Sequence, residues 1–422
     1  MIHIPFDYYA LDNGLRVVLA RDARAPVVAV NLWYNVGSRN ERSGRTGFAH
    51  LFEHMMFQGS LHVPETGHFA FIEKAGGSLN GSTWLDRTNY FETVPAHHLE
   101  LALWLESDRL GWLLPAMTQE KLDNQRDVVK NERRWRVDNQ PYGDWDERLQ
   151  ALVYPSDHPY HHSVIGSMAD LDDAGLQDVE AFFRTYYAPN NAVLTVCGDF
   201  DDTHARAAVE HYFGEIPSGP AIPPIPGSLD LPPLIGREQN VTVQQDISLP
   251  RVYAAYRIPR FGDDRFYPAA VAAEILGGGK ASVLNRKLVI KQRVAQDVVA
   301  YAFPIVISAA MLVTWATAAH DVEAERVESA LLAAIDELRV VSDDDVARAI
   351  SLISTRHLTE LQRVDERADA FSMMTTLFDD PGRVNTELER YRAVTTADVR
   401  EFASACFIPE NRCVLKYVKS GS

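Results

Sequence analysis

The chain has 422 residues, more than one ordinary domain, so its length predicts two or more domains. It carries 41 Lys and Arg against 58 Asp and Glu, a formal net charge of −17. This balance argues against nucleic acid as a partner, because phosphate binding needs clustered cations. There is no apolar run long enough to predict a membrane span.

The first elements in chain order are strands. Residues 15–20 and 27–32 are rich in β-branched and apolar side chains, as strands are. The first of them begins close to the N-terminus, with no signal-peptide core before it. We therefore expect a cytoplasmic protein, or a periplasmic one if a signal peptide has been trimmed.

Residues 50–54 read His-Leu-Phe-Glu-His and give the sharpest indication of chemistry. Four residues turn a helix by about 400°, so His50 and His54 project from one face, about one turn apart. Two imidazole nitrogens at that separation can share one Zn²⁺. Glu53 flanks the same face, where a carboxylate can take a proton from a water activated by the metal. The order H-x-x-E-H reverses the commoner H-E-x-x-H and is the inverzincin motif.

The residues around the motif predict a helix with one apolar side. A stripe at i, i+3, i+4 and i+7 is formed by Phe48, Leu51, Phe52 and Met55. The alternative is a histidine pair on a surface or in a core, which needs no metal. A catalytic zinc site usually takes three protein ligands, so a third should come from another element.

Glu132 is the best candidate for that third ligand. Residues 99–110 and 122–134 have helical character, and the second segment contains no Gly or Pro. One face of this second helix carries Gln125, Val128, Val129 and Glu132. A carboxylate on a half-apolar face needs a partner, and a metal is one. The alternative is an ion pair between Glu132 and a nearby arginine.

The two halves of the chain repeat one pattern of helix, Pro-Asn turn and strand. Corresponding residues lie 220 positions apart: Asp178 and Asp398, Phe182 and Phe402, Pro189 and Pro409, Asn191 and Asn411. Three cysteines, an odd number without a CxxC pair, predict buried free thiols: Cys197, Cys406 and Cys413.

A proline-rich run between the repeats, residues 217–236, predicts an extended linker. We therefore predict two homologous domains, residues 1–216 with the H-x-x-E-H motif and residues 237–422 without a metal site. Strands followed by long helices make each an α+β domain, with helices packed on one face of its sheet.

Residues 47–59 resemble the zinc site of the pitrilysin/insulinase (M16) metallopeptidases, a family that includes insulin-degrading enzyme and the mitochondrial processing peptidase. The resemblance covers essentially the whole chain, which looks like a short two-domain subunit of the processing-peptidase kind. It implies zinc ligation by His50, His54 and Glu132, which follows His54 by 78 residues, with Glu53 as general base. It also implies paired αβ-roll domains, each with a mixed, largely antiparallel sheet.

Residues 76–83 and 88–91 match the family as well. In the family this segment is the sheet edge that pairs with the substrate backbone. The resemblance therefore implies that the substrate-binding residues are Asn80, Gly81, Ser82 and Thr83. An amide such as that of Asn80 could hold a peptide that lies as an added strand. The alternative is that Asn80 only serves the turn after Gly76.

Two positions depart from the family pattern. Members often have a second Glu seven residues before the ligand, where this chain has Gln125, whose amide we expect to hydrogen-bond to a metal ligand. Active members also place an Arg and a Tyr in the other half, which orient the substrate carbonyl and stabilise the oxyanion. Alignment puts Val289 and Gln296 at those positions, and neither side chain can do that work.

This departure leads to an expectation about partners. The family builds a closed chamber from four such domains, and this chain supplies two. We expect a heterodimer with a related subunit that carries the Arg and Tyr, and keep a homodimer as the second possibility.

The sequence thus predicts a metalloendopeptidase, a zinc hydrolase with one Zn²⁺ per chain that cleaves short unfolded peptides inside a chamber. One alternative is a non-catalytic structural or assembly subunit that retains the metal site; another is a processing peptidase for targeting peptides. The intact Glu53 favours catalysis, because a purely structural site needs no base.

Overall fold

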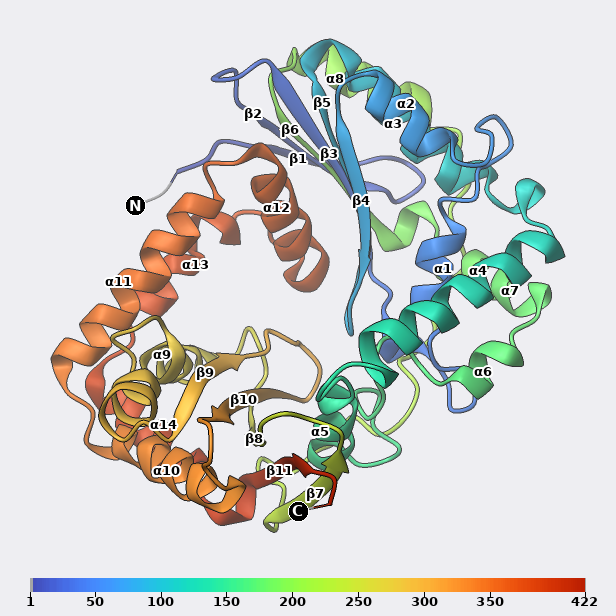
Figure 1. The fold of residues 1–422 in the computed structure, drawn as a ribbon. Coiled ribbons are helices and arrows are strands. Elements are labelled where there is room, and N and C mark those ends of the chain that lie inside the picture. Colours follow the sequence, from blue (N-terminus) through green and yellow to red (C-terminus); the bar gives the residue numbers. More distant parts are fainter. Residues whose placement is uncertain (1–2, 422) are drawn as a thin grey trace. The chain divides into compact units, whose positions relative to one another are not determined.

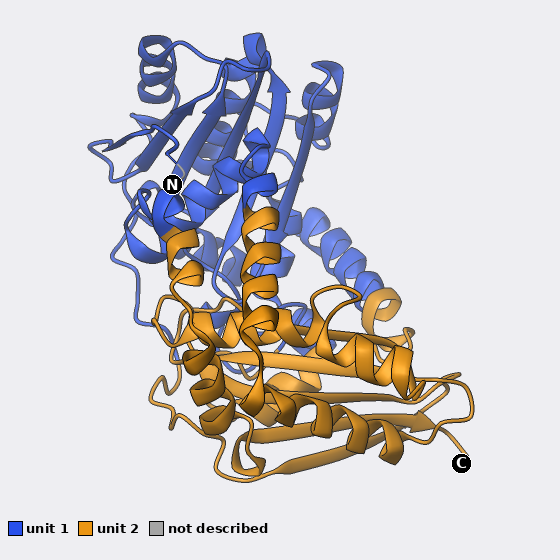
Figure 2. Cartoon of the chain, turned by 90° about the vertical axis from the view of Figure 1, so that its left-hand side faces the viewer, with its two compact units in different colours: residues 1–133, 163–226, 358–386 blue, residues 134–162, 227–357, 387–422 orange. Residues whose placement is uncertain are grey.

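The computed structural model describes residues 3–421, which divide into two compact units (Figure 2). Unit 1 comprises residues 3–133, 163–226 and 358–386, and unit 2 comprises residues 134–162, 227–357 and 387–421. Each unit is built on one mixed, mostly antiparallel sheet covered by helices (Figure 1). This confirms the predicted fold class of two α+β domains.

The sheet of unit 1 has the strand order β1-β2-β6-β3-β5-β4, in which only β2 and β6 run parallel within the described residues. Its strands are β1 (Asp7–Ala10), β2 (Arg16–Arg21), β3 (Val27–Tyr34), β4 (Ser78–Thr83), β5 (Thr88–Pro95) and β6 (Ala192–Gly198). Its helices are α1 (Phe48–Met55), α2 (Gly67–Lys74), α3 (Leu99–Trp112), α4 (Gln119–Arg133), α6 (Met168–Asp172), α7 (Leu176–Tyr186), α8 (Asp202–Phe213) and α12 (Val364–Phe378).

The sheet of unit 2 has the order β7-β11-β8-β10-β9. Its strands are β7 (Gln239–Gln245), β8 (Arg251–Pro259), β9 (Ala295–Ala302), β10 (Ala309–Ala318) and β11 (Arg412–Lys419). Its helices are α5 (Trp145–Val153), α9 (Phe266–Gly277), the π-helix Asn285–Lys291, α10 (Ala324–Asp336) and α14 (Thr396–Cys406). Two further helices, α11 (Asp343–Glu360) and α13 (Arg383–Arg392), span the boundaries between the units.

The predicted repeat is present in both units. α7 and α14 begin 220 residues apart, at Leu176 and Thr396, and each leads through a short Pro-Asn helix into a central strand. The turn asparagines are fixed alike: Asn191 donates to the Tyr186 carbonyl at 2.8 Å, and Asn411 donates to the Cys406 carbonyl at 3.0 Å. The same side chain therefore closes the same turn twice.

The units do not follow the contiguous domains expected from sequence. Residues 217–236 contain no helix or strand, as expected of a linker, and the division between the units falls within them. However, residues 358–386 belong with unit 1, because α12 packs across β3 and β6. Residues 134–162 belong with unit 2, because α5 packs against β8 and β11. An apolar helix face shows that a helix is covered, but not which sheet covers it.

The two faces of the unit 1 sheet have different partners. Val28, Val30 and Leu32 of β3 join one hydrophobic core with α1, α3, α7 and α8. Since side chains alternate along a strand, Asn31 and Trp33 point to the opposite face, where α12 lies. α12 therefore adds cover on the second face of the sheet.

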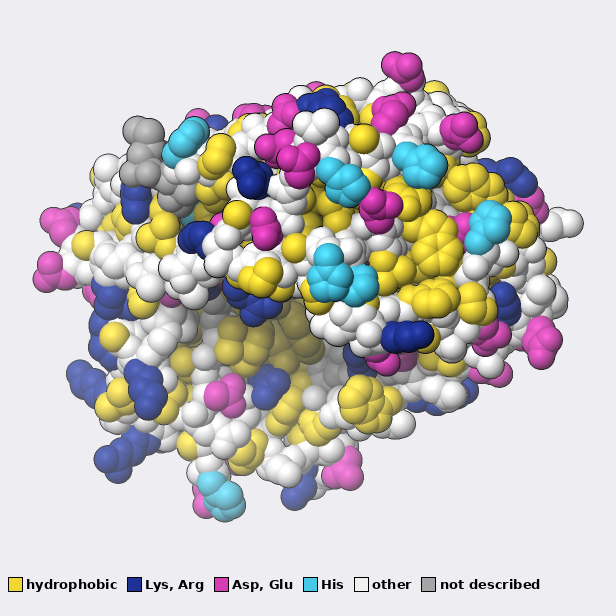
Figure 3. Space-filling view, turned by 90° about the horizontal axis from the view of Figure 1, so that it is seen from above, with side chains coloured by type: hydrophobic (Ala, Val, Ile, Leu, Met, Phe, Trp, Pro, Cys, Tyr) yellow, Lys and Arg dark blue, Asp and Glu magenta, His cyan; other side chains and the backbone are white. Residues whose placement is uncertain are grey.

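The three cysteines are free thiols, as expected. Cys197 and Cys413 are buried free thiols and Cys406 is a free thiol that is only half-buried, so one of the three is more accessible than predicted. Acidic side chains are scattered among basic and apolar ones over the face shown in Figure 3. Among residues 3–421, no helix is both long and apolar enough to cross a bilayer.

The buried His68 on α2 makes folding sensitive to acid. Burial lowers the pKa of His68 to about 3, and the nearby Arg109 charge acts in the same direction. Below pH 6.5 the His68 side chain is protonated in the unfolded chain, whereas in the folded chain it stays neutral down to about pH 3. This group should therefore remove up to about 1.4 kcal/mol of unfolding free energy per pH unit within that window.

The measurement is the slope of the urea-unfolding free energy between pH 6 and 4, in chelator, for the wild type and His68→Leu. The dependence of unfolding free energy on pH should be weaker in the variant, by the equivalent of up to about one bound proton. This difference in slope does not depend on the absolute stability of the variant. Equal slopes would show that His68 is protonated in the folded chain.

Candidate metal centre

α1 and α4 bring three potential metal ligands together in unit 1. The Nε2 atoms of His50 and His54 lie 3.7 and 3.3 Å from Oε2 of Glu132. Ligand atoms of these three side chains all lie within 4.8 Å of one another, and this is the one such group of three or more found in residues 3–421. His50 and His54, one turn apart on α1, therefore lie close to Glu132 on α4, which follows His54 by 78 residues along the chain.

The donor set and its spacing fit zinc. Two imidazole nitrogens and one carboxylate oxygen are ordinary zinc ligands, and three protein ligands leave a fourth position open. Ligands bound tetrahedrally at about 2.0–2.2 Å lie about 3.3–3.6 Å apart. The observed separations of 3.3 and 3.7 Å from Glu132 are close to that value, and the ligand atoms of the two histidines lie within 4.8 Å of each other.

The start of α1 is fixed by a buried carboxylate that the sequence did not reveal. Oε2 of Glu41 accepts from the Gly47 amide at 2.9 Å, and Oε1 accepts from the Ala49 amide at 2.7 Å. These are amides at the N-terminal end of the helix, which have no acceptor within it. Burial raises the pKa of the Glu41 carboxyl well above its usual range, whereas the two amides act in the opposite direction. Gly47 itself is in the left-handed region, with φ of 86°, and a Cβ there would lie 2.6 Å from the Ile165 carbonyl oxygen.

α4 is anchored along the side that faces α6. Arg126 donates to the carbonyls of Leu171 and Ala174, at 2.8 and 2.5 Å, and Lys130 pairs with Asp172 at 2.6 Å. These contacts set the rotation of α4 and hence the direction of Glu132. The expected apolar face is present only in part, because Val129 is buried but Val128 is 41% exposed.

Glu53 lies half-buried beside the three ligands. Burial raises the pKa of the Glu53 carboxyl, whereas a hydrogen bond with Thr83 and the charges of His54 and Arg87 act in the opposite direction. The contact with Thr83 joins the candidate base to the end of strand β4. The base and the predicted substrate strand are therefore neighbours.

β4 is an edge strand, which leaves one side of its backbone unpaired by the sheet. The amide of Trp84 donates to the Arg87 carbonyl at 2.8 Å in the turn to β5, and bonded pairs alternate along an antiparallel ladder. Ser82 is then bonded to β5, while the backbone groups of Gly81 and Thr83 point to the free edge. An extended peptide could pair with such an edge.

The four predicted substrate-binding residues differ in what they contact. Asn80 is exposed, and its side-chain oxygen accepts from the Gly81 amide at 2.9 Å. A Cβ at Gly81 would lie 3.1 Å from the rings of Phe57 and Tyr90, so a side chain there would require these rings to move by a few tenths of an ångström. The Ser82 hydroxyl donates to Asn89 at 2.7 Å.

Gln125 is buried on α4, and its amide donates to Asn124 at 3.0 Å. The expected hydrogen bond to a metal ligand is therefore not the one seen. Val289 lies on the π-helix Asn285–Lys291, and Gln296 lies exposed on the edge strand β9. These are the two positions at which active family members would have an Arg and a Tyr.

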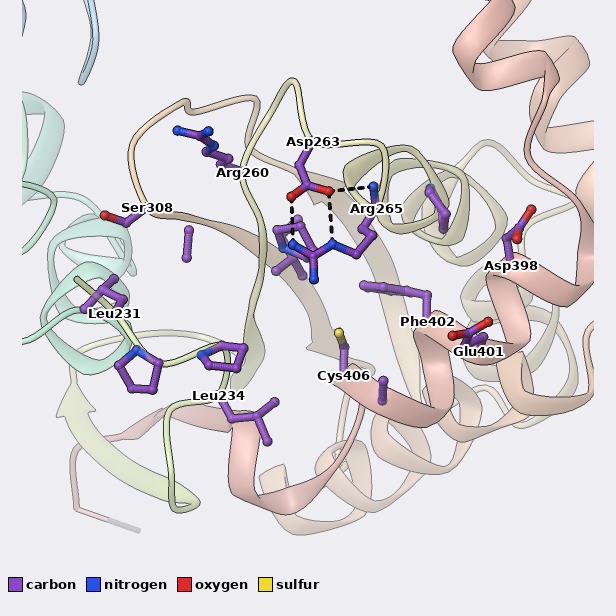
Figure 4. A pocket seen from close by; sticks show the side chains of 17 residues that line it. Leu231, Leu234, Arg260, Asp263, Arg265, Ser308, Asp398, Glu401, Phe402 and Cys406 are labelled. Atoms are coloured by element: carbon purple, nitrogen blue, oxygen red, sulfur yellow. Dashed lines mark hydrogen bonds and ion pairs between the residues drawn. The ribbon is translucent and has the colours of Figure 1, made fainter. Parts of the chain in front are cut away.

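A cavity of about 700 Å³ lies within unit 2 and is unrelated to these groups (Figure 4). Apolar side chains such as Leu234 and Phe402 line it, and the ion pair between Asp263 and Arg265 closes one side. No predicted site residue lines this cavity.

A paired α+β fold with a His, His, Glu cluster on two helices defines a metallopeptidase-like protein. Residues 16–154 match the family description "Insulinase (Peptidase family M16)", and residues 173–353 match "Peptidase M16 inactive domain". The zinc protease PqqE of Helicobacter pylori is 30% identical over 334 residues, which cover 78% of this chain and 73% of that protein. The chain belongs to the M16 peptidase family.

Solved structures agree with this assignment. A protease from Helicobacter pylori superposes with a TM-score of 0.92 at 25% identity, covering 98% of this chain and 99% of that one. A peptidase M16 inactive domain from Pseudomonas fluorescens has the same fold, with a TM-score of 0.85 at 16% identity, and covers 99% of both chains.

If His50, His54 and Glu132 hold the metal, removing one of them should lower zinc content. We expect Glu132→Ala and His54→Ala to retain clearly less than one zinc per chain after dialysis, measured by atomic emission. Glu120→Ala, an exposed position on the same helix α4, is the matched control and should keep the wild-type content. A full complement of zinc in Glu132→Ala would mean that another residue is the third ligand.

Glu41 should stabilise the fold through α1 rather than bind metal. Glu41→Ala leaves two amides without their acceptor, which should cost about 2–4 kcal/mol of unfolding free energy in chelator. Glu41→Gln keeps one acceptor oxygen and should lose less. Unfolding in urea measures both, with the exposed Glu65→Ala as control; an unchanged Glu41→Ala would contradict the capping role.

Proposed function

We propose that this chain is a zinc-dependent endopeptidase that acts on short, unfolded peptides. The observation that supports it most is that the His50, His54 and Glu132 cluster lies beside an acidic group, Glu53, which is not one of the ligands. A structural metal site would need the ligands alone. The names of the related proteins, which include zinc proteases, agree with this proposal.

His50, His54 and Glu132 would hold the ion. Zinc, when bound, supplies Lewis acidity toward a carbonyl and lowers the pKa of water to about 7. Glu53 accepts the proton of the attacking water and passes it to the leaving amine. Its partly buried position keeps it from bulk solvent, and its hydrogen bond with Thr83 keeps it at the end of β4.

The free edge of β4 would bind the peptide backbone. A peptide added as a strand would pair with the outward backbone groups of Gly81 and Thr83. The side-chain amide of Asn80, whose oxygen accepts from the Gly81 N–H, would then hydrogen-bond to the peptide instead. Backbone pairing tolerates many sequences, but it requires an extended chain. This is why unfolded peptides, rather than folded proteins, are the expected substrates.

We propose a heterodimer as the working form. Val289 and Gln296 cannot supply the Arg and Tyr that active members use, so a related subunit would contribute them. A homodimer is the second possibility. The chamber, the single zinc per chain and the cytoplasmic or periplasmic location belong to this same proposal.

The first test is cleavage of a quenched fluorescent peptide by the purified chain, with and without chelator. Glu53→Gln should keep its zinc and lose turnover by about 10²-fold or more, because the general base is gone. Glu73→Gln, an exposed glutamate on α2, is the matched control and should behave as wild type. Normal cleavage by Glu53→Gln would show that Glu53 is not the base.

The same assay separates the possible assemblies. Chelator-sensitive turnover by the chain alone would overturn the heterodimer, and sedimentation would then show whether a homodimer forms. Zinc without turnover, restored by a related subunit bearing the Arg and Tyr, would support the heterodimer. Zinc without turnover under either condition would favour a non-catalytic assembly subunit.

A further inference from the structure

Asp369 on α12 accepts several hydrogen bonds from side chains on the sheet of unit 1. One of its carboxylate oxygens accepts from Nε1 of Trp33 at 2.9 Å, from the Asn31 amide at 3.2 Å and from the Asn89 amide at 3.1 Å. Trp33 and Asn31 lie on β3, and Asn89 lies on β5. Asp369 thereby ties α12 to two neighbouring strands at once.

Two side chains extend this network to the edge strand. Asn89, held by Asp369, accepts from the Ser82 hydroxyl at 2.7 Å and from Arg87 at 2.9 Å. The same Arg87 nitrogen donates to the Ser82 carbonyl at 2.9 Å, and the guanidinium carbon lies 5.2 Å from the centre of the Trp33 ring. The network of Asp369 thus reaches Ser82 through Asn89 and Arg87, and Asn89 also donates to the side-chain oxygen of Asn31 at 3.2 Å.

Apolar packing does not fix this end of the hairpin by itself. A cavity of about 180 Å³ lies between the hairpin and α12, with Ser82, Arg87, Asn89 and Asp369 among its lining residues. Space of that size would let the polar side chains change rotamer if one of them lost its partner. The backbone pairing of Ser82 with Asn89 sets the register of the strand, and the side-chain hydrogen bonds hold Ser82 and Arg87 in their orientations beside this space.

We propose that Asp369 is a positioning residue for the peptide-binding edge, acting through Asn89 and Arg87 on Ser82. The inference rests on the proposed function, because it assigns that edge to the substrate. It means that a helix from the second half of the sequence sets the geometry of a strand next to Glu53. Asp369 touches neither the metal ligands nor the peptide in this scheme.

A first experiment tests the anchoring without any catalysis. Amide hydrogen exchange over residues 78–89 is compared in the wild type, Asp369→Ala and Ser372→Ala. Ser372 is the matched control: it lies on the same helix, is buried and donates to Thr195 on β6 at 2.8 Å, away from the edge. Asp369→Ala should speed exchange in the hairpin by about tenfold or more, while Ser372→Ala should not.

Asp369→Asn provides the rescue. Its side-chain oxygen can still accept from Trp33 and Asn89, so exchange in residues 78–89 should return most of the way to wild type. Hairpin exchange that is equal in Asp369→Ala and the wild type, or equally fast in Asp369→Ala and Ser372→Ala, would overturn the proposal.

A second experiment connects the anchoring to substrate. Binding of a fluorescent peptide is measured by anisotropy in the Glu53→Gln background, where the peptide is not cleaved. Adding Asp369→Ala should weaken binding about tenfold, and KM in the active background should rise by a similar factor with a smaller change in kcat. Zinc content should stay at the level of the parent.

The outcomes separate the two ideas. Peptide binding that Asp369→Ala leaves unchanged would overturn the positioning role while the proposed function stands. A parent that binds no peptide either alone or with a related subunit bearing the Arg and Tyr, but whose hairpin exchange responds to Asp369→Ala as expected, would reject the proposed function and support the anchoring.

Discussion

The chemistry proposed for this chain depends on the packing of α1 against α4. α1 carries His50, Glu53 and His54 in little more than one turn, but the cluster is complete only when α4 presents Glu132 to the same point. Metal–ligand bonds tolerate errors of only about 0.2 Å, so both helices must be held from outside the site. Glu41 does this for α1 by accepting from backbone amides, and Arg126 and Lys130 do it for α4 by bonding to backbone carbonyls and to an acidic side chain.

Local periodicity was enough to place the elements. The stripe on α1 is buried at all four positions, and the repeated helix, turn and strand begin where their 220-residue offset requires. Periodicity could not place α12 or α5 in the correct unit, because it reports only that one helix face is covered. It also could not separate Val128 from Val129, since their difference in exposure comes from the angle at which α4 meets its neighbours.

The candidate site, like the fold, could be predicted from the sequence only in part. The spacing of His50 and His54 is a property of a single helix, so it could be predicted without tertiary structure. Glu132 was identified from a helical face and from resemblance, and its convergence with α1 required the fold. Glu41 and Asp369 gave no sequence signal, because their partners are backbone amides or side chains from distant strands.

The position of α12 also constrains how the protein comes to be folded. Asn31 and Trp33 on β3 are almost fully buried under a helix that starts at Val364. During synthesis the strands of unit 1 are made long before that helix exists. Until α12 is made, one face of the sheet is exposed to solvent, and Asn31 and Trp33 do not have the Asp369 carboxylate as their hydrogen-bond acceptor. The half of the chain that carries the candidate metal ligands can therefore complete its folding only after most of the other half has been synthesised.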